Sequence, residues 1–372
     1  MRSAGAPAPR EFGGSLSCAA GHFGHETQKG GFTGGDDAQV ANLVDRAHQS
    51  IIVTTTMKRV IFALCAVLAV GCLNAQTKAW QPSPGQTQIP IWPGAVPDAQ
   101  PVKGPEMVAA VTNELVAGKP WLWVGNVSRP TMTVYSPKGR NTGVAVVVFP
   151  GGGYYGLAID LEGTEICDWL ASKGITGVLL KYRVPGSGPH WDPKLKRHLE
   201  PKAPAALEDA QRTVGLVRFH AAEWHIDARK IGVLGFSAGG HLVANVSTHF
   251  RRRLYSMVDP ADDASCRPDF AVAVYPGHMT ENTTNEFQLN PTLPVSSKMP
   301  PQFVLQAEDD YVDGVEQSLV YYIALKKAGV PVEMHLYAQG GHAFGLRRTQ
   351  AQITAWPELV EKWLKTIGMI PD

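Results

Sequence analysis

The chain has 372 residues, of which 44% are hydrophobic and 18% charged, which is enough for one large α/β domain or two smaller ones. It contains 34 Lys and Arg residues against 33 Asp and Glu residues, so its formal net charge is +1. This balance gives no sign of a nucleic-acid-binding protein or of a strongly charged substrate.

The first 75 residues are predicted to be two segments outside the fold. Residues 1–56 are rich in Gly, Ala and polar residues and lack apolar periodicity. We expect them to be a non-native upstream extension, the alternative being a disordered regulatory leader. Residues 57–75 combine Met57-Lys58-Arg59 with a short apolar run, which is typical of a secretory signal peptide and too short for a comfortable membrane span.

The end of this signal allows two outcomes. Cleavage after Ala75 gives a mature chain that starts at Gln76, whereas residues 69–72 resemble a lipoprotein box with Cys72 as the lipidated residue. Both outcomes predict an exported protein, periplasmic or secreted, and only the second gives it a membrane contact, through a lipid anchor at Cys72. Cys167 and Cys266 remain in the mature chain and allow one disulfide without requiring it. No cysteine or histidine cluster suggests a metal site, and no cofactor is expected.

Residues 76–130 are rich in Pro and Gly at their start and are predicted to form an extended N-terminal segment. Residues 131–372 are predicted to be one catalytic domain. Strands are expected at 131–135, 144–149, 175–182, 230–236, 270–275, 302–307 and 332–337. Helices are expected at 165–172, 205–224, 238–245, 315–328 and 353–367, and in the fourth of these Leu319, Tyr322 and Ile323 should face the core. This alternation predicts the α/β class, with a mainly parallel central sheet and helices on both faces.

A glycine-rich loop follows the strand at 144–149, whose continuous apolar run indicates burial on both faces. Three glycines, Gly151 to Gly153, can expose backbone N–H groups that no side chain shields. In an ester hydrolase such a loop supplies half of the oxyanion hole, here from Gly152 or Gly153. A plain Gly-rich turn is the structural alternative. A Walker-type phosphate loop is excluded because Tyr154-Tyr155 follow the glycines.

The stretch Gly235-Phe236-Ser237-Ala238-Gly239 lies between a predicted strand and a predicted helix, which is the arrangement of a nucleophile elbow. Ser237 would sit on a strained turn, and the glycines two residues before and after it leave room for the crowded backbone. The N–H of Ala238 at the helix start can help to hold an oxyanion. The structural alternative is a helix start packed closely on a strand.

Two further chemical groups follow predicted strands directly: the acidic cluster 308–310 and His342. In a mainly parallel sheet the active residues gather at the carboxyl ends of the strands. The order along the chain is nucleophile, acid, histidine, as in α/β-hydrolases. The sequence therefore predicts a serine hydrolase in which His342 takes the proton of Ser237.

These motifs resemble α/β-hydrolases of the exported esterase and acetyl-xylan-esterase-like kind, with relatives among feruloyl esterases and prolyl-oligopeptidase-like proteins. The resemblance covers residues 131–367 and rests on the Gly-rich loop, Tyr182-Arg183-Val184, the elbow, Asp309-Asp310 and the stretch 340–344. Pro150 stands where hormone-sensitive-lipase relatives have a histidine. The resemblance implies an α/β-hydrolase fold with Asp310 as the acid. Asp309 is the second candidate, and Asp313 the third, because it is expected to cap the following helix.

The resemblance implies hydrolysis of short-chain carboxylic esters through an acyl-enzyme, with a small-molecule or carbohydrate ester, such as acetylated hemicellulose, as the substrate. Tyr154 and Trp191 are candidate substrate-binding residues, although a Trp such as Trp191 more often simply anchors its loop. His241 is expected to be a packed structural residue. Two alternatives stay open: a prolyl-oligopeptidase-like exopeptidase, and an inactive carbohydrate-binding protein on the same fold.

Overall fold

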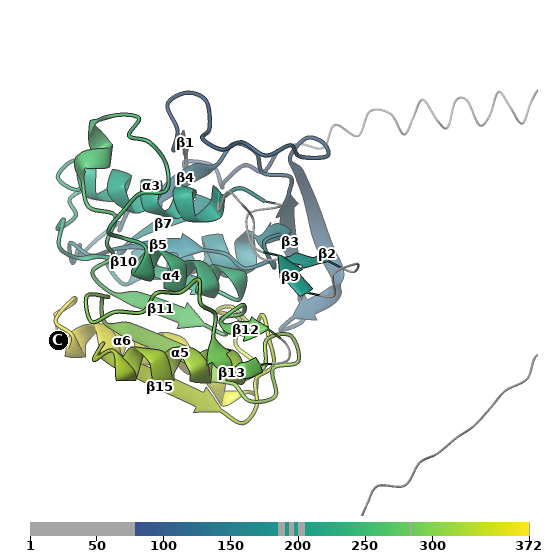
Figure 1. Cartoon of the computed structure of the whole chain (residues 1–372). Coiled ribbons are helices and arrows are strands. Elements are labelled where there is room, and N and C mark those ends of the chain that lie inside the picture. The colour runs from purple at the N-terminus through teal and green to yellow at the C-terminus, as the bar shows by residue number, and fades with distance from the viewer. Residues whose placement is uncertain (1–78, 185–189, 193–196, 200–204, 283–284, 372) are drawn as a thin grey trace, which may run out of the picture. The chain divides into compact units, whose positions relative to one another are not determined.

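The computed structural model describes residues 79–184, 190–192, 197–199, 205–282 and 285–371, without the side chains of residues 185–204 and 282–286 (Figure 1). The chain divides into two units, residues 1–75 and residues 76–372. The first unit lies outside the described residues, and so do the expected upstream extension, the signal peptide and Cys72. Those assignments therefore remain predictions.

The main sheet has eight strands in the order β1-β4-β7-β5-β10-β11-β14-β15, and it is parallel from β7 to β15. Only the pairs β1–β4 and β4–β7 are antiparallel. Strands β5, β7, β10, β11 and β14 are buried along their whole length, as their apolar runs predict. The bounds are β1 (Gln88–Pro90), β4 (Thr131–Tyr135), β5 (Ala145–Phe149), β7 (Thr176–Lys181), β10 (Ile231–Phe236), β11 (Ala271–Val274), β14 (Gln302–Ala307) and β15 (Val332–Tyr337).

Helices cover both faces of this sheet, as the alternation of elements predicts. Successive residues of β14 show it: the ring of Phe303 lies 5.6 Å from that of Trp363 on α6, whereas Val304 packs in the cluster that holds Tyr321 of α5. Helix α2 joins the face of α6, since the rings of Trp169 and Trp356 are 5.7 Å apart. The helices are α2 (Glu165–Ser172), α3 (Ala205–Phe219), α4 (Ala238–Thr248), α5 (Glu316–Lys327) and α6 (Trp356–Thr366). None of the helices in the described ranges is long and apolar enough to cross a membrane.

The prediction that Leu319, Tyr322 and Ile323 of α5 face the core is wrong by one position along the helix. Ile323 is 47% exposed, and the buried side chains include Ser318 and Tyr321. Hydrogen bonds set this orientation. The hydroxyl of Ser318 donates to Gln306 at 2.9 Å, and that of Tyr321 donates to Gln302 at 3.1 Å. Both glutamines are buried on β14, so leaving them unpaired would be costly.

Three small sheets lie apart from the main one. The segment before residue 131 contributes β2 (Met107–Val116) and β3 (Lys119–Gly125); β3 pairs with β2 on one side and with β6 (Gly156–Ala158) on the other. Two hairpins lie in the segments 183–204 and 280–301: β8 (His190–Asp192) with β9 (Arg197–Leu199), and β12 (Thr280–Asn282) with β13 (Asn285–Leu289). These strands were not predicted from the sequence. In Figure 1 the arrowheads of β11 and β15 point toward the side where β2, β12 and β13 lie.

Buried charges attach the extended N-terminal residues to the domain. Trp92 donates its indole N–H to Asp209 of α3 at 2.8 Å. Arg183, which follows β7, pairs with the same carboxylate and also donates to the carbonyl of Pro97 at 2.6 Å. The two cysteines of the described chain, Cys167 and Cys266, are both buried and free, so the disulfide that the sequence allowed is not formed.

Candidate active site

Ser237 occupies the strained turn that the elbow motif predicts, with φ 51° and ψ −120°, between β10 and α4. Its flanking glycines are needed for close contact. A Cβ on Gly235 would lie 2.2 Å from the carbonyl oxygen of Gly239, and one on Gly239 would lie 2.1 Å from the carbonyl oxygen of Phe149 on β5. Because neither distance is tolerable, both positions require glycine, and the elbow prediction is confirmed as geometry.

His342 and Asp310 lie together at the same edge of the sheet. Nδ1 of His342 is 2.8 Å from Oδ2 of Asp310, a carboxylate that is 7% exposed. The other carboxylate oxygen accepts the N–H groups of Val312 and Asp313 at 2.9 and 3.0 Å. Burial alone would lower the pKa of His342, but the hydrogen bond and charge of Asp310 outweigh it, so the pKa is raised. The pair therefore leaves Nε2 as the nitrogen that faces away from Asp310.

The two other candidate acids have different surroundings. Asp309 accepts the N–H groups of Gly340 and Gly341, both at 2.8 Å, and so holds the loop that carries His342. Asp313 does not cap α5, because the residue at the cap position is Val315 and it makes no side-chain cap bond. The capping expectation for Asp313 was wrong.

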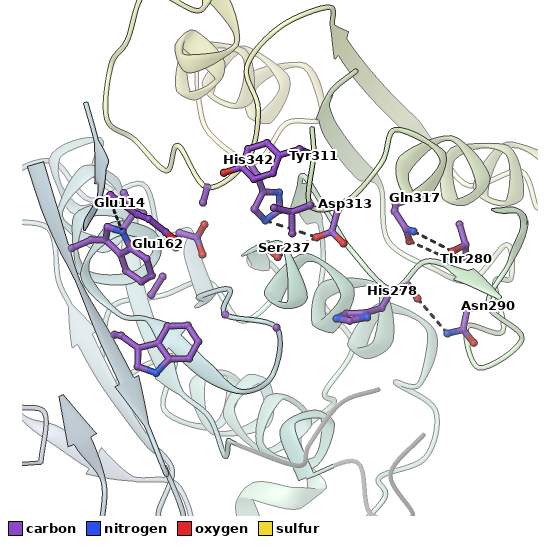
Figure 2. A pocket seen from close by; sticks show the side chains of 18 of the residues that line it. Glu114, Glu162, Ser237, His278, Thr280, Asn290, Tyr311, Asp313, Gln317 and His342 are labelled. Atoms are coloured by element: carbon purple, nitrogen blue, oxygen red, sulfur yellow. Dashed lines mark hydrogen bonds and ion pairs between the residues drawn. The ribbon is translucent and has the colours of Figure 1, made fainter. Parts of the chain in front are cut away.

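Asp313 instead lies beside the nucleophile. Ser237 Oγ donates to Asp313 Oδ2 at 3.2 Å, and the same oxygen is 3.8 Å from His342 Nε2. Figure 2 shows these three side chains converging, with Glu162 on the other side of Ser237. Within the described ranges, the hydrogen bond of the Ser237 hydroxyl goes to Asp313 and not to His342.

The glycine loop forms a tight turn next to Ser237. Gly152 and Gly153 have φ of 130° and 60°, and the carbonyl of Gly152 accepts the N–H groups of Tyr155 and Gly156. The N–H of Gly151 is engaged by Glu162 at 2.7 Å, whereas Gly152 and Gly153 line the cavity that contains Ser237. Ala238 follows Ser237 directly as the first residue of α4.

Glu162 is a further carboxylate at the site, besides Asp310 and Asp313, and it was not predicted from the sequence. It lies in a π-helical turn, η1 (Asp160–Thr164), is 2% exposed, and accepts the hydroxyl of Tyr275 at 2.9 Å. Burial raises its pKa, against the opposing effects of His342, Tyr275 and the N–H of Gly151. Its sequence neighbourhood offers no catalytic motif, so only its distance from the Gly-rich loop, 11 residues, could have drawn attention to it.

Ser237 and His342 open into one cavity of about 550 Å³. Its other walls come from β3, with Trp121 and Trp123, and from polar residues around the β12–β13 hairpin (Figure 2). Asp310 lies outside the lining, behind the ring of His342. The lining residues include Glu114, Leu161, Glu162, His278, Thr280, Asn290, Tyr311, Asp313 and Gln317.

Tyr154, a predicted substrate-binding residue, is placed elsewhere. It is 4% exposed and its hydroxyl hydrogen-bonds to Nδ1 of His241 at 2.9 Å, so it packs under the site and does not line the cavity. His241 is buried, as expected, and burial keeps the pKa of its ring well below the ordinary value. Trp191 belongs to β8, and its side chain lies outside the described residues.

Comparison with known proteins shows the family. The model of the prolyl oligopeptidase family matches residues 168–368, more than half of the chain. A curated relative named acetylxylan esterase, from Xylanibacter ruminicola, is 27% identical over 282 residues, which are 70% of this chain and 53% of that protein. The chain thus spans about half the length of this relative.

Solved structures agree with this result. The acetyl ester-xyloside bifunctional hydrolase from Caldicellulosiruptor lactoaceticus is 33% identical with a TM-score of 0.59, covering 76% of this chain and 97% of that one. The α/β-hydrolase MGS-M1 from a deep-sea metagenome library of the Medee basin is 24% identical with a TM-score of 0.52, covering 70% and 98%. The chain therefore belongs to the prolyl oligopeptidase family and has the α/β-hydrolase fold.

Proposed function

We propose that this protein is a serine esterase that removes short acyl groups, acetyl above all, from small-molecule or carbohydrate esters. The observation that carries the proposal is that Ser237 and His342 open into one cavity while Asp310 holds Nδ1 of the histidine. The acetylxylan esterase and the acetyl ester-xyloside hydrolase among its relatives support this substrate class.

Ser237, His342 and Asp310 have the roles of nucleophile, base and orienting acid. The Ser237 hydroxyl leaves its contact with Asp313, turns to Nε2 of His342 and gives up its proton as Oγ attacks the ester carbonyl. The tetrahedral intermediate collapses, and the imidazolium protonates the departing alcohol. Water, activated by the same nitrogen, then releases the acid from the acyl-enzyme.

Backbone amides hold the negative charge of each tetrahedral intermediate. The N–H of Ala238 is at the amino end of α4, where the helix dipole favours an anion. The second donor is the N–H of Gly152 or Gly153 on the loop after β5. The Gly151 amide is occupied by Glu162, so it is unsuited to this task. Loss of one such donor typically lowers kcat about a hundred- to a thousand-fold.

The experiment is a series of p-nitrophenyl esters from acetyl upward, run beside acetylated xylan and methyl ferulate. We expect the highest kcat/KM for acetyl and release of acetate from the polysaccharide. Ser237→Ala is the matched control and should lose at least about a thousand-fold in kcat. An unchanged rate in that variant would refute the assignment of the nucleophile.

An exopeptidase is the second candidate, because the matching family model is named for prolyl oligopeptidase. Hydrolysis of aminoacyl-p-nitroanilides at rates near those of the acetyl ester would favour it. Binding to xylan without turnover of any ester, and without an effect of Ser237→Ala, would point to an inactive carbohydrate-binding protein.

We also propose that the protein is exported, on the basis of the basic start and apolar run at residues 57–71. Expression of the gene in a bacterium, followed by cell fractionation and mass measurement of the N-terminal peptide, tests this. A start at Gln76 supports cleavage, and a lipidated Cys72 supports anchoring. A cytoplasmic chain that retains residues 57–75 contradicts export.

A further inference from the structure

Asp313 is a carboxylate inside the active site to which the proposed mechanism assigns no role. It lies on the loop between β14 and α5, and its side chain is 16% exposed. The backbone makes room for it: a Cβ on Gly277 would lie 2.4 Å from its Oδ1. It cannot replace Asp310 as the orienting acid, because its Oδ2 lies 3.8 Å from Nε2 of His342, the nitrogen that must stay free to take the serine proton.

The position of Asp313 is next to the alcohol part of a bound ester. The alcohol oxygen leaves with a proton from Nε2 of His342, so it must come within about 3 Å of that nitrogen. It is also bonded, until that moment, to the carbon that Ser237 attacks. Since Oδ2 of Asp313 is 3.2 Å from Ser237 Oγ and 3.8 Å from Nε2, it lies beside both reacting atoms.

Asp313 loses its donor when the reaction starts. In the free enzyme the Ser237 hydroxyl donates to it, and this bond ends when the hydroxyl turns to His342. A largely buried carboxylate without a donor is unfavourable. A hydroxyl group of the substrate, close to the ester oxygen, would replace the bond that is lost.

We propose that Asp313 is a specificity-determining residue that accepts a hydrogen bond from a free hydroxyl on the carbon next to the one bearing the ester. This proposal rests on the proposed roles of Ser237 and His342. The protein then prefers monoesters of vicinal diols, such as partially acylated sugars, to simple alkyl esters. A neighbour that is itself acylated or alkylated has no hydrogen to donate and is a poor substrate.

The surroundings of Asp313 suit such an alcohol. Burial raises the pKa of Asp313 to about 6, against the opposing charge of His342, so above that pH the carboxylate is ionised and acts only as an acceptor. Trp121 and Trp123 line the same cavity and offer ring faces for the apolar side of a sugar. Trp121 is held by a hydrogen bond from its indole N–H to the carbonyl of Glu114 at 2.9 Å.

The test compares three acetates: 2-hydroxyethyl acetate, 2-methoxyethyl acetate, in which the hydroxyl hydrogen is replaced, and propyl acetate, which matches the first in size. We expect the wild-type kcat/KM to be about ten- to a hundred-fold higher for the first than for the other two. Asp313→Ala should reduce this ratio to below about threefold, and Asp313→Asn should give an intermediate value. Because the two kcat/KM values in each ratio come from the same variant, a smaller fraction of folded protein affects both equally and does not change the ratio.

Glu114→Gln is the matched control. Glu114 is an exposed carboxylate on the wall of the same cavity, so its loss changes the charge of the cavity and keeps the contact between Asp313 and Ser237. Its ratio should equal that of the wild type. The proposal is overturned if the wild type shows no preference, if Asp313→Ala keeps it, or if Glu114→Gln abolishes it equally. Absence of p-nitrophenyl acetate turnover by the wild type would refute the esterase assignment instead.

Discussion

Replacement of Asp310 by asparagine tests the assignment of the acid. Oδ1 of Asp310 accepts two backbone N–H groups, so the amide oxygen of Asn must occupy that place. The NH₂ group then replaces Oδ2, which is 2.8 Å from Nδ1 of His342. Facing a donor, the neutral imidazole accepts at Nδ1 and carries its proton on Nε2. That tautomer cannot take the proton of Ser237.

The expected loss in kcat of Asp310→Asn is about 10⁴-fold, the size known for a serine triad whose histidine is held in the wrong tautomer. At about 1.36 kcal/mol per factor of ten, this is about 5.4 kcal/mol of transition-state stabilisation. The assay is steady-state hydrolysis of p-nitrophenyl acetate at pH 8, with thermal unfolding of each variant to confirm that it is folded.

Asp309→Asn is the matched comparison, one residue away. The amide oxygen can still accept the N–H groups of Gly340 and Gly341, so we expect less than about a tenfold loss. A folded Asp310→Asn protein with kcat within tenfold of the wild type would refute the reasoning. So would a larger loss in Asp309→Asn than in Asp310→Asn.

Three further predictions concern pH and stability. The raised pKa of His342 keeps its ring protonated to higher pH, so kcat/KM should rise with a midpoint above the ordinary value of about 6.5. Glu162→Gln removes a charge that contributes to this, and a pH–rate profile should show the midpoint at lower pH; an unmoved midpoint speaks against the coupling. Gly239→Ala should destabilise the fold by about 3 kcal/mol in urea unfolding, the upper end of the usual cost of overpacking, because its Cβ would collide with a backbone carbonyl of β5, and wild-type stability would contradict this. Arg183→Met should cost about 3–5 kcal/mol in the same assay by leaving the buried charge of Asp209 uncompensated, and a loss below about 1 kcal/mol would count against that pairing.

The central sheet could be predicted because its determinants are local. Each buried strand is a continuous apolar run of a few residues, and all of them except β11 precede a segment with helical periodicity. Strands β4, β14 and β15 and helix α2 have the predicted bounds, and β5, β7, β10 and β11 differ by one residue at one or both ends. Strand β1 was not predicted. The elbow motif could also be recognised from the sequence, because its five residues are contiguous. The need for glycine at position 235 arises within the motif, from the carbonyl of Gly239, whereas the need for Gly239 arises from the carbonyl of Phe149 on β5.

The positions of Glu162, Trp121 and Trp123 around the cavity could not be predicted, since contacts between distant parts of the chain bring these residues there. Glu162 meets Gly151 and Tyr275 through a π-helical turn that has no sequence signature. Strand β3, which carries both Trp121 and Trp123, lies in a segment whose Pro and Gly content suggested only extended chain.

The roles of the three aspartates near His342 could not be assigned from the local sequence. From the order of residues, Asp309, Asp310 and Asp313 were all candidates for the partner of His342. Their separation in the structure depends on how the loop after β14 meets the loop after β15: Asp309 binds backbone amides, Asp310 meets Nδ1, and Asp313 lies on the side of Nε2. Residue types and spacing predict which groups arrive at an edge of the sheet. Only packing in three dimensions decides which atom of an imidazole each carboxylate faces, because that orientation depends on distances between loops about 30 residues apart in the chain.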